Sequence, residues 1–246
     1  MIQVICPVCG AALAPQGAAW RCVQGHCFDV ARQGYVNLLT VTQKHSRHPG
    51  DTREMVAARR AFLDAGWYAP IAKTLADLVR RFCPAAEAVL DAGCGEGYYL
   101  SQLGWVPERW GIDISRDAVR YAAARDRSAH WLTATAAHLP FADGGFDCVL
   151  SMFALTAGAE FARVLRPGGI FLIVNESDGE DPHASKWLSV IDGMRIFDGD
   201  QLARFLTEAG FSEIIINRNA KKHWLCVLAM RENSSLLENE EPSGIS

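Results

Sequence analysis

The sequence predicts an α/β fold: a mostly parallel sheet covered by helices on both faces, with a small cysteine-rich unit in front of it. From residue 86 onward, strand-like apolar runs alternate with helical patterns, which is typical of a parallel sheet. A glycine-rich turn follows the first of these runs, and four cysteines with one histidine crowd the first 27 residues. The chain has 246 residues and is 50% hydrophobic, which excludes a fibrous or wholly disordered protein.

The cysteine-rich unit, taken as residues 1–38, has the ligand spacing of a zinc ribbon. Two residues separate Cys6 from Cys9, and Cys22 and His26 form a second pair further along. Two such pairs close a tetrahedron around one ion, and four protein ligands indicate a structural zinc ion. Cys27 follows His26 directly, so spacing alone leaves either residue as the fourth ligand.

Two helices are predicted in the next segment, residues 39–85, which begins with a basic linker. The linker covers residues 40–51 and contains Pro49 and Gly50 side by side, a typical turn pair. Apolar residues then recur at helical spacing over 52–65 and again over 68–82.

The sheet domain is predicted over residues 86–231. Strands are expected at 88–91, 110–114, 130–133, 146–152 and 170–174, with helices between them at 98–103, 116–125 and 158–164. A last helix at 199–209 precedes strands at 213–218 and 223–230, which a polar loop at 219–222 joins into an antiparallel hairpin. The tail, 232–246, carries four Glu residues and is expected to be disordered.

The charge is divided unevenly along the chain. Its net value is −4, yet residues 1–60 hold seven Lys or Arg and three Asp or Glu, a net of +4, which leaves −8 for the rest. A contact with a polyanion is therefore expected at the N-terminal end. No apolar run approaches the roughly 20 residues of a membrane span, and the first ten residues lack a signal pattern. A cytoplasmic location with reduced thiols follows as an expectation.

The glycine-rich turn has the pattern Gly93-x-Gly95-x-Gly97, which is neither a dinucleotide fingerprint nor a P-loop. Its glycines permit a tight turn and a close approach of a ligand to the backbone. Asp91 precedes the turn, and Asp113 ends the next predicted strand, where an acid binds ribose hydroxyls in related nucleotide folds. This arrangement resembles motif I of class I S-adenosylmethionine-dependent methyltransferases.

Two later strings, LPFADGGFD at 139–147 and RPGG at 166–169, also resemble methyltransferase blocks, in the expected order. The resemblance implies a Rossmann-like, seven-stranded sheet that closes with an antiparallel hairpin, and it implies S-adenosylmethionine as methyl donor. Thr135 stands where a polar residue contacts adenine in such enzymes.

The N-terminal half narrows the resemblance. The strings GYVNLL at 34–39, SRHPGD at 46–51, ARRAFL at 58–63 and DAGCGEGYY at 91–99 follow the ribbon. Together they resemble the RlmA-type 23S rRNA guanine-N1 methyltransferases, closely over residues 5–100 and more loosely to Gly169. The resemblance implies a cytoplasmic, often dimeric enzyme that methylates a guanine N1 in ribosomal RNA. It implies cofactor contacts at Tyr68, Gly95 and Glu96, and it favours His26 as the fourth zinc ligand.

The methyl acceptor is the less determined part of this interpretation. Guanine N1 carries a proton at neutral pH, so its methylation needs a base or a polar stabilising group. The candidates near the expected strand ends are His138, Glu176, Asp178 and His183. The segment 175–199 is short and dissimilar to its counterpart in the family. A methyltransferase of the same descent that acts on a small molecule is therefore the alternative.

A basic, partly aromatic stretch supplies the predicted RNA surface. Its charged members are Arg32, Lys44, His45, Arg47, His48, Arg53, Arg59 and Arg60. Phosphate contacts are their expected role, although a solvated helix face is the alternative for Arg59 and Arg60. Tyr35 and Trp20 are candidates to stack on unpaired bases, and packing inside the ribbon is the alternative for Trp20.

Overall fold

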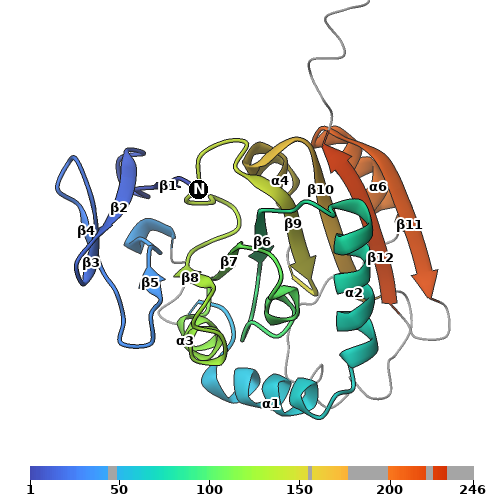
Figure 1. The fold of residues 1–246 in the computed structure, drawn as a ribbon, viewed down its shortest axis with the longest axis horizontal. Coiled ribbons are helices and arrows are strands. Elements are labelled where there is room, and N and C mark those ends of the chain that lie inside the picture. The colour runs from blue at the N-terminus through green and yellow to red at the C-terminus, as the bar shows by residue number, and fades with distance from the viewer. Residues whose placement is uncertain (44–48, 155–156, 177–198, 220–223, 232–246) are drawn as a thin grey trace, which may run out of the picture.

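The computed structural model describes residues 1–43, 49–154, 157–176, 199–219 and 224–231, which form one small and one large sheet (Figure 1). Several predicted features lie outside these residues: Lys44, His45, Arg47, His48, Asp178, His183, most of the hairpin loop and the tail at 232–246. Within the described part, no helix is long and apolar enough to cross a membrane.

The small sheet is the predicted ribbon. It contains β1 (Val4–Ile5), β2 (Ala12–Gln16), β3 (Ala19–Cys22) and β4 (Cys27–Asp29), in that order and all antiparallel. Its strands are short because turns at the ligand-bearing loops interrupt them. Few of their side chains are buried, so this unit has little apolar core of its own.

The large sheet has the strand order β11-β12-β10-β9-β6-β7-β8-β5. Its members are β5 (Val36–Asn37), β6 (Ala88–Ala92), β7 (Glu108–Asp113), β8 (His130–Thr133), β9 (Phe146–Met152), β10 (Leu165–Glu176), β11 (Phe211–Asn219) and β12 (Trp224–Arg231). The pairs from β10 through β9, β6, β7, β8 and β5 are parallel, whereas β12 is antiparallel to β10 and β11. The predicted parallel sheet and closing antiparallel pair are thus confirmed.

The strand count differs from the prediction by one, because β5 adds an eighth strand at the edge. Val36 and Asn37 pair in parallel with Leu132 and Thr133 of β8. Two residues are too short to show the alternation that reveals a strand in a sequence. Residues 36–37 were assigned to the small unit from the sequence, but here they extend the large sheet.

Helices flank the sheet close to the predicted positions. They are α1 (Arg53–Asp64), α2 (Ala69–Phe82), α3 (Arg116–Arg125), α4 (Gly158–Val164) and α6 (Gly199–Glu208), with short 3₁₀ turns η1 (Val41–Gln43) and η2 (Leu100–Leu103). Thr52 caps α1, since its hydroxyl accepts the Met55 N–H at 3.3 Å.

The helix predicted at 98–103 is instead only the 3₁₀ turn η2. The side chains of Ser101 and Gln102 both donate to the carbonyl of Tyr98, at 2.7 and 3.2 Å. Such local side-chain bonds compete with regular helical hydrogen bonding.

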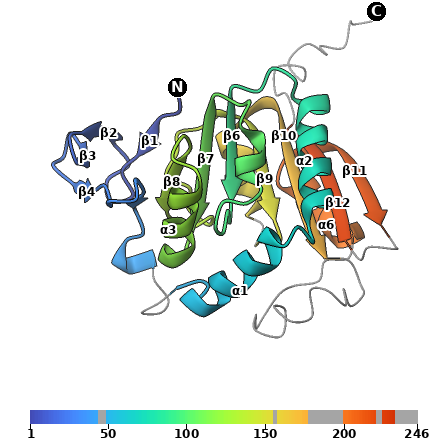
Figure 2. The same cartoon turned by 60° about the horizontal axis from the view of Figure 1, so that its bottom comes forward.

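Two hydrophobic clusters occupy the two faces of the sheet. Along β6, Val89 belongs to one cluster and Leu90 to the other, as expected for alternating side chains. The Val89 face is covered by α2, η2 and α3, and the Leu90 face by α4 and α6 (Figure 2). Helices on both faces, as predicted, bury most residues of the parallel strands.

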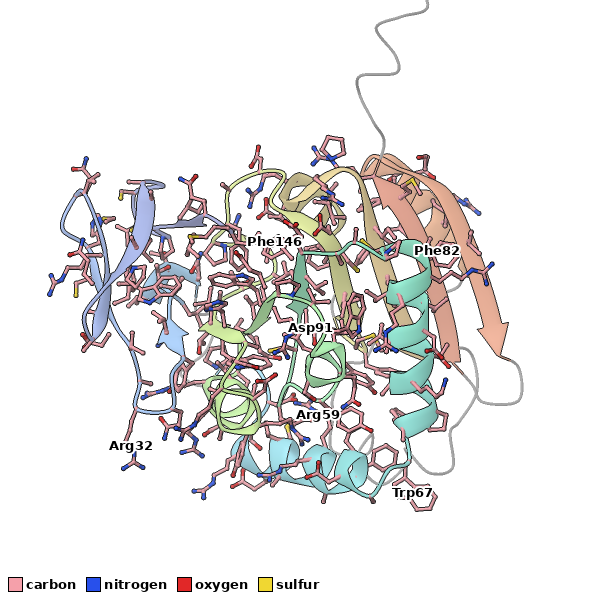
Figure 3. All side chains as sticks on the ribbon, viewed as in Figure 1. Arg32, Arg59, Trp67, Phe82, Asp91 and Phe146 are labelled. Carbon is pink, nitrogen blue, oxygen red and sulfur yellow. The ribbon has the colours of Figure 1, made fainter. Side chains whose placement is uncertain are left out.

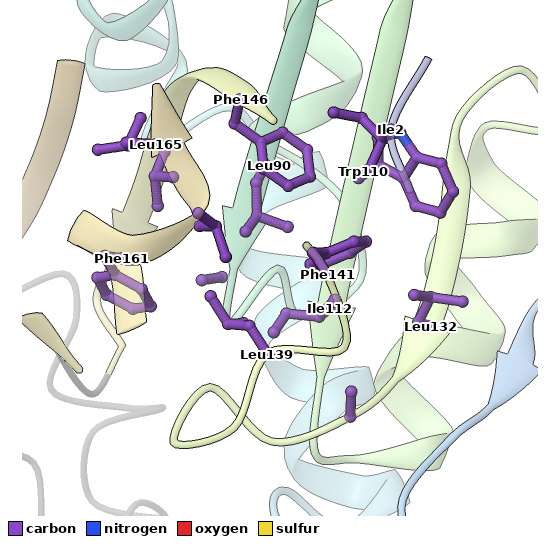
Figure 4. Close-up of a cluster of buried hydrophobic side chains, with 14 of the residues drawn as sticks. Ile2, Leu90, Trp110, Ile112, Leu132, Leu139, Phe141, Phe146, Phe161 and Leu165 are labelled. Atoms are coloured by element: carbon purple, nitrogen blue, oxygen red, sulfur yellow. The ribbon is translucent and has the colours of Figure 1, made fainter. Parts of the chain in front are cut away.

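The ribbon joins the core on the Leu90 face. Val4 forms an antiparallel bridge with Phe141, the Ile5 N–H donates to the Pro140 carbonyl at 2.9 Å, and Ala142 N–H donates to Gln3 at 3.0 Å. Ile2 reaches the buried group around Trp110 (Figure 4). The small sheet therefore shares apolar packing with the large one.

Trp20 is part of this shared packing. Its ring meets the edge of Trp110, a β7 residue, with 6.2 Å between the ring centroids. Its side chain thus packs in the joint core of the two sheets rather than standing free to stack on a base.

Candidate functional site

The loop residues that carry chemistry gather at the carboxyl end of the parallel strands. The glycine turn follows β6, Asp113 ends β7, and Thr135 follows β8. Helix α1 lies at the edge of the sheet toward which β9 points (Figures 1 and 2). Ligands bind at this edge in open α/β sheets, so the expected cofactor residues share the appropriate side of the molecule.

The glycine turn adopts a conformation that other residues strain to reach. Gly93 and Gly95 have φ angles of 87° and 55°. A Cβ at Gly93 would lie 2.4 Å from the Ala154 side chain, and one at Gly95 would lie 2.9 Å from Nη2 of Arg59. The bare backbone therefore allows the segments after β9 and from α1 to approach the turn closely.

Asp91 lies near the end of β6, two residues before Gly93, and is fully buried (Figure 3). Neither of its carboxylate oxygens has a hydrogen-bond partner among the described residues. Burial, followed by the charges of Asp113 and Glu96, raises the pKa of Asp91 to about 8. An unsatisfied buried carboxyl group is costly, and it fits a site that receives a positively charged ligand.

Asp113 is held firmly at the end of β7. Its two oxygens accept the backbone N–H groups of Gly95 at 2.9 Å and Ser115 at 2.7 Å. Burial raises the pKa of Asp113, although these hydrogen bonds and Arg59 oppose that shift. Each carboxylate oxygen retains a further lone pair, so the predicted contact with ribose hydroxyls stays compatible with this geometry.

Glu96 forms a buried ion pair with α1 that the sequence analysis missed. Its side chain is 2% exposed, and its Oε2 accepts the Nε–H of Arg59 at 2.9 Å. Arg59 also pairs through Nη1 with Asp51. Glu96 Oε1 and Arg59 Nη2 are both buried without a partner in the described part of the chain.

Arg59 is therefore misplaced in the predicted RNA surface. The neighbouring Arg60 is exposed and pairs with Asp64 at 3.2 Å, as expected for a solvated helix face. Successive residues of a helix point about 100° apart, so one of two adjacent arginines faces the cofactor turn and the other faces solvent.

An aromatic group extends from this edge. The Tyr68 ring stacks on Phe153 with centroids 5.4 Å apart, and Phe62 packs edge-on against Tyr68 at 4.9 Å. Phe153 follows β9 and has a φ angle of 54°, which is rare for a non-glycine residue and marks functional sites. The sequence analysis missed Phe153. Its position directly after a buried parallel strand was the available signal.

Tyr35 does not have the free ring that base stacking requires. It is 3% exposed, and its hydroxyl oxygen accepts the Nε–H of Arg116 at 3.0 Å. It precedes β5 directly, and its ring belongs to the hydrophobic cluster on the Val89 face of the sheet.

The predicted acceptor-side residues are only partly located. Thr135 is half-buried, and its hydroxyl accepts the Ala137 N–H at 3.2 Å. His138 is exposed in the same turn, and its backbone N–H donates to the Thr135 carbonyl at 3.3 Å. Glu176 is the last residue of β10.

The candidate metal centre lies in the ribbon. One side-chain atom from each of Cys6, Cys9, Cys22 and His26 falls within 4.8 Å of the others. Sγ of Cys22 lies 3.4 Å from His26 Nδ1 and 3.7 Å from Cys9 Sγ. Cys27 is exposed and outside this group. Three sulfur atoms and one imidazole nitrogen form a donor set that zinc binds tetrahedrally, so these residues fit the ion.

Comparisons with known proteins agree with the fold. The family described as "Methyltransferase domain" matches residues 90–173. A solved S-adenosylmethionine-dependent methyltransferase from Thermotoga maritima aligns with a TM-score of 0.56 at 17% identity, covering 74% of this chain and all of the other. A putative methyltransferase from Haloferax volcanii, in complex with the activator Trm112, aligns with a TM-score of 0.57 at 21% identity, over 73% and 95% of the two chains. The chain is a class I S-adenosylmethionine-dependent methyltransferase.

Relatives and the ribbon define the family. The family described as "RlmA, N-terminal", a zinc ribbon, matches residues 4–47. A putative 23S rRNA (guanine-N1) methyltransferase of Micromonospora griseorubida is 39% identical over 79% of this chain and 70% of its own length. The 23S rRNA (guanine(748)-N1)-methyltransferase of Streptomyces fradiae is 38% identical over 78% and 69%. This chain belongs to the RlmA-type 23S rRNA guanine-N1 methyltransferase family.

Proposed function

We propose that this protein transfers the methyl group of S-adenosylmethionine to N1 of a guanine in large-subunit ribosomal RNA. The carrying observation is that two relatives with that named activity are 38–39% identical over nearly four fifths of the chain. Methyltransferases with other names match less of this chain: an O-methyltransferase of Penicillium expansum matches 54% of it, and the malonyl-[acyl-carrier protein] O-methyltransferase of Yersinia pestis matches 44%.

The cofactor is proposed to occupy the carboxyl edge of the sheet. The proposed contacts are Tyr68, Asp91, Gly93, Gly95, Glu96, Gly97, Asp113 and Thr135. When bound, the cofactor supplies an activated methyl group on a cationic sulfur atom. Asp91 and Glu96 are buried acids with oxygens that have no hydrogen-bond partner among the described residues, which suits a cationic ligand. The glycines let the ligand approach the backbone, and the rings of Tyr68 and Phe153 exclude water. The main task of these residues is alignment of the methyl group with the acceptor atom.

The proton on guanine N1 must leave during the transfer. Within the described residues, His138 is the proposed base that accepts this proton, because it is exposed in the turn after β8 that also carries Thr135. Glu176, Asp178 and His183 remain proposals from the sequence.

Ribosomal RNA is proposed to contact the N-terminal half. Arg32, Arg53 and Arg60 are exposed there and suit phosphate contacts. Trp67 is 54% exposed in the turn between α1 and α2, and its ring stacks on Phe62 with centroids 6.5 Å apart. Because Trp67 directly precedes Tyr68, we assign its ring as a stacking surface for an unpaired base beside the cofactor edge. A cytoplasmic location and a homodimer complete the proposal.

The proposed function is tested with donor carrying a labelled methyl group and 23S rRNA that lacks the modification. Label should enter the RNA, and reverse transcription should stop at a single guanine, because N1 methylation blocks base pairing. Tight cofactor binding without label in the RNA would contradict the proposal. Label in small-molecule extracts would then support the alternative acceptor.

A further inference from the structure

Arg59 projects from α1 toward the turn that follows β6 (Figure 3), and its three nitrogen atoms have different surroundings. Nε donates to Glu96 at 2.9 Å, and Nη1 pairs with Asp51. Nη2 is buried and has no partner among the described residues, and it lies 2.9 Å from where a Cβ of Gly95 would stand. Nε thus fastens α1 to the loop, Nη1 pairs with the segment just before α1, and the third nitrogen lies beside the bare backbone of the glycine turn.

A buried, unpartnered guanidinium nitrogen is expensive. An unmet hydrogen bond of a buried charged group costs more than that of a neutral one, and the charge of Arg59 persists at every physiological pH. Within the structure's described residues, no acid near the turn accepts from Nη2: Asp51 and Glu96 pair with the other two nitrogens of Arg59, and Asp113 accepts two backbone N–H groups. The oxygens of Asp91 and Oε1 of Glu96 are also without a partner among these residues, so none of them is bonded to Nη2. The free N–H of Nη2 therefore indicates an acceptor that arrives with a ligand.

S-adenosylmethionine carries a negatively charged carboxylate on its methionine portion besides its two positive groups. The acids at this edge suit the positive groups. Two described cations reach the turn: Arg125, whose Nε donates to the Glu96 carbonyl at 3.2 Å and whose Nη2 pairs with Asp64, and Arg59, whose Nη2 is buried beside Gly95 without a partner among the described residues. We propose that Nη2 of Arg59 donates a hydrogen bond to the carboxylate of the cofactor, while Nε holds α1 on the loop through Glu96 and Nη1 pairs with Asp51. A charge-assisted bond of this kind adds both affinity and orientation.

Calorimetry with two cofactor forms tests this contact without RNA. The wild-type chain is titrated with S-adenosylmethionine and with decarboxylated S-adenosylmethionine, which keeps the sulfonium but lacks the carboxylate. The wild type should prefer the intact cofactor by on the order of tenfold or more. Arg59→Gln should remove most of that preference.

Arg59→Lys is the second variant, included because Arg59→Gln could lose the preference merely by misfolding. Lysine keeps a cation for Glu96 and Asp51 but offers one nitrogen instead of three, so it should fold and still lose the preference. Arg60→Gln is the matched control, because Arg60 is the exposed neighbour on the same helix, and it should retain the wild-type preference. Thermal unfolding curves verify that each variant is folded.

Two results would overturn the proposal. One is equal affinity of the wild type for both cofactor forms, which would leave Arg59 as a clamp between α1 and the loop. The other is an unchanged preference in folded Arg59→Lys and Arg59→Gln. Because no RNA is present, neither result bears on the identity of the methyl acceptor.

Discussion

The candidate metal centre takes its four ligand atoms from residues 6–26, whereas the cofactor edge draws its charged groups from α1, β6, β7 and the intervening loop. In the ribbon, backbone turns bring the ligands together: the N–H of Gly10 donates to Cys6, and the N–H of Gly25 donates to Cys22. At the cofactor edge, groups far apart in the chain meet only after the sheet has formed. A site made of neighbours is readable from spacing, and a site made of distant segments is readable only in part.

Removal of zinc should give the largest effect and test how self-contained the ribbon is. Cys22→Ser should abolish zinc binding and unfold the ribbon, because structural zinc contributes on the order of 10 kcal/mol in zinc-finger peptides. The ribbon also pairs with residues 140–142, so the melting temperature of the whole chain should fall. Zinc content by atomic absorption and thermal unfolding measure both effects.

Cys27→Ser is the control for the metal centre. Cys27 is exposed and lies outside the ligand group, so this variant should keep one zinc ion per chain. Loss of zinc from Cys27→Ser but not from a His26→Ala variant would exchange the roles assigned to these two residues.

Asp91→Asn should give the second largest effect, at the cofactor edge. The asparagine keeps the shape of a fully buried side chain but removes the negative charge that faces a cationic ligand. Affinity for S-adenosylmethionine should fall on the order of tenfold to a hundredfold, the range of a charged hydrogen bond. Asp117→Asn is the control, because Asp117 is a partly exposed acid that pairs with Arg120 on the surface of α3. Equal calorimetric affinities of the wild type and Asp91→Asn would contradict the assignment.

The metal centre and the cofactor edge also differ in how much of each the sequence predicts. The ribbon ligands follow from local spacing, and α3, α4, β8 and β9 were placed correctly because their apolar patterns are local too. The glycine turn, Asp91 and Asp113 were also readable, since each sits at a strand end. Arg59 was assigned to the surface because two adjacent arginines look alike in a sequence. Only the packing of α1 shows which of them turns inward.

The sequence predictions for Tyr35 and Phe153 failed for a related reason. Tyr35 was predicted to have a free ring because β5, the strand that follows it and joins it to the large sheet, is only two residues long. Phe153 gave no sequence signal besides its position, since its left-handed conformation depends on what packs around it. What stabilises each of these features is a contact with a residue far away in the chain, such as Arg116 for Tyr35.

The pH dependence of cofactor binding sharpens the electrostatic side of the comparison. The pKa of Asp91 is raised from 3.8 to about 8, so below pH 8 this group is protonated in the ligand-free protein. Binding a cationic ligand must then release that proton. Affinity should therefore rise by up to about tenfold per pH unit toward pH 8 and level off above it.

Asp91→Asn isolates this contribution. The amino group of the cofactor titrates in the same way with both proteins, so the difference between their pH profiles reports Asp91. Between pH 3.8 and about 8, the folded protein holds this proton more tightly than the unfolded chain does, so the contribution of Asp91 to stability falls as pH rises across that window and is fully lost above it. The ligand-free wild type should thus lose stability from about pH 4 to pH 8, and no further above pH 8, relative to Asp91→Asn. If the pH profiles of the wild type and Asp91→Asn run parallel, the group that titrates is not Asp91.

Trp67→Ala should give the smallest effect and adds the acceptor side to the comparison. Removing an exposed ring that stacks on a base costs about 1 kcal/mol, so the KM for RNA should rise roughly fivefold. Affinity for S-adenosylmethionine should stay unchanged. Phe82→Ala is the matched control, because Phe82 is also exposed but lies at the opposite end of α2 (Figure 3). If both variants raise the KM alike, the effect reflects α2 as a whole. If only Trp67→Ala raises the KM, the base-stacking surface adjoins the cofactor edge. The acceptor site is then, like that edge, assembled from segments that meet only in the fold.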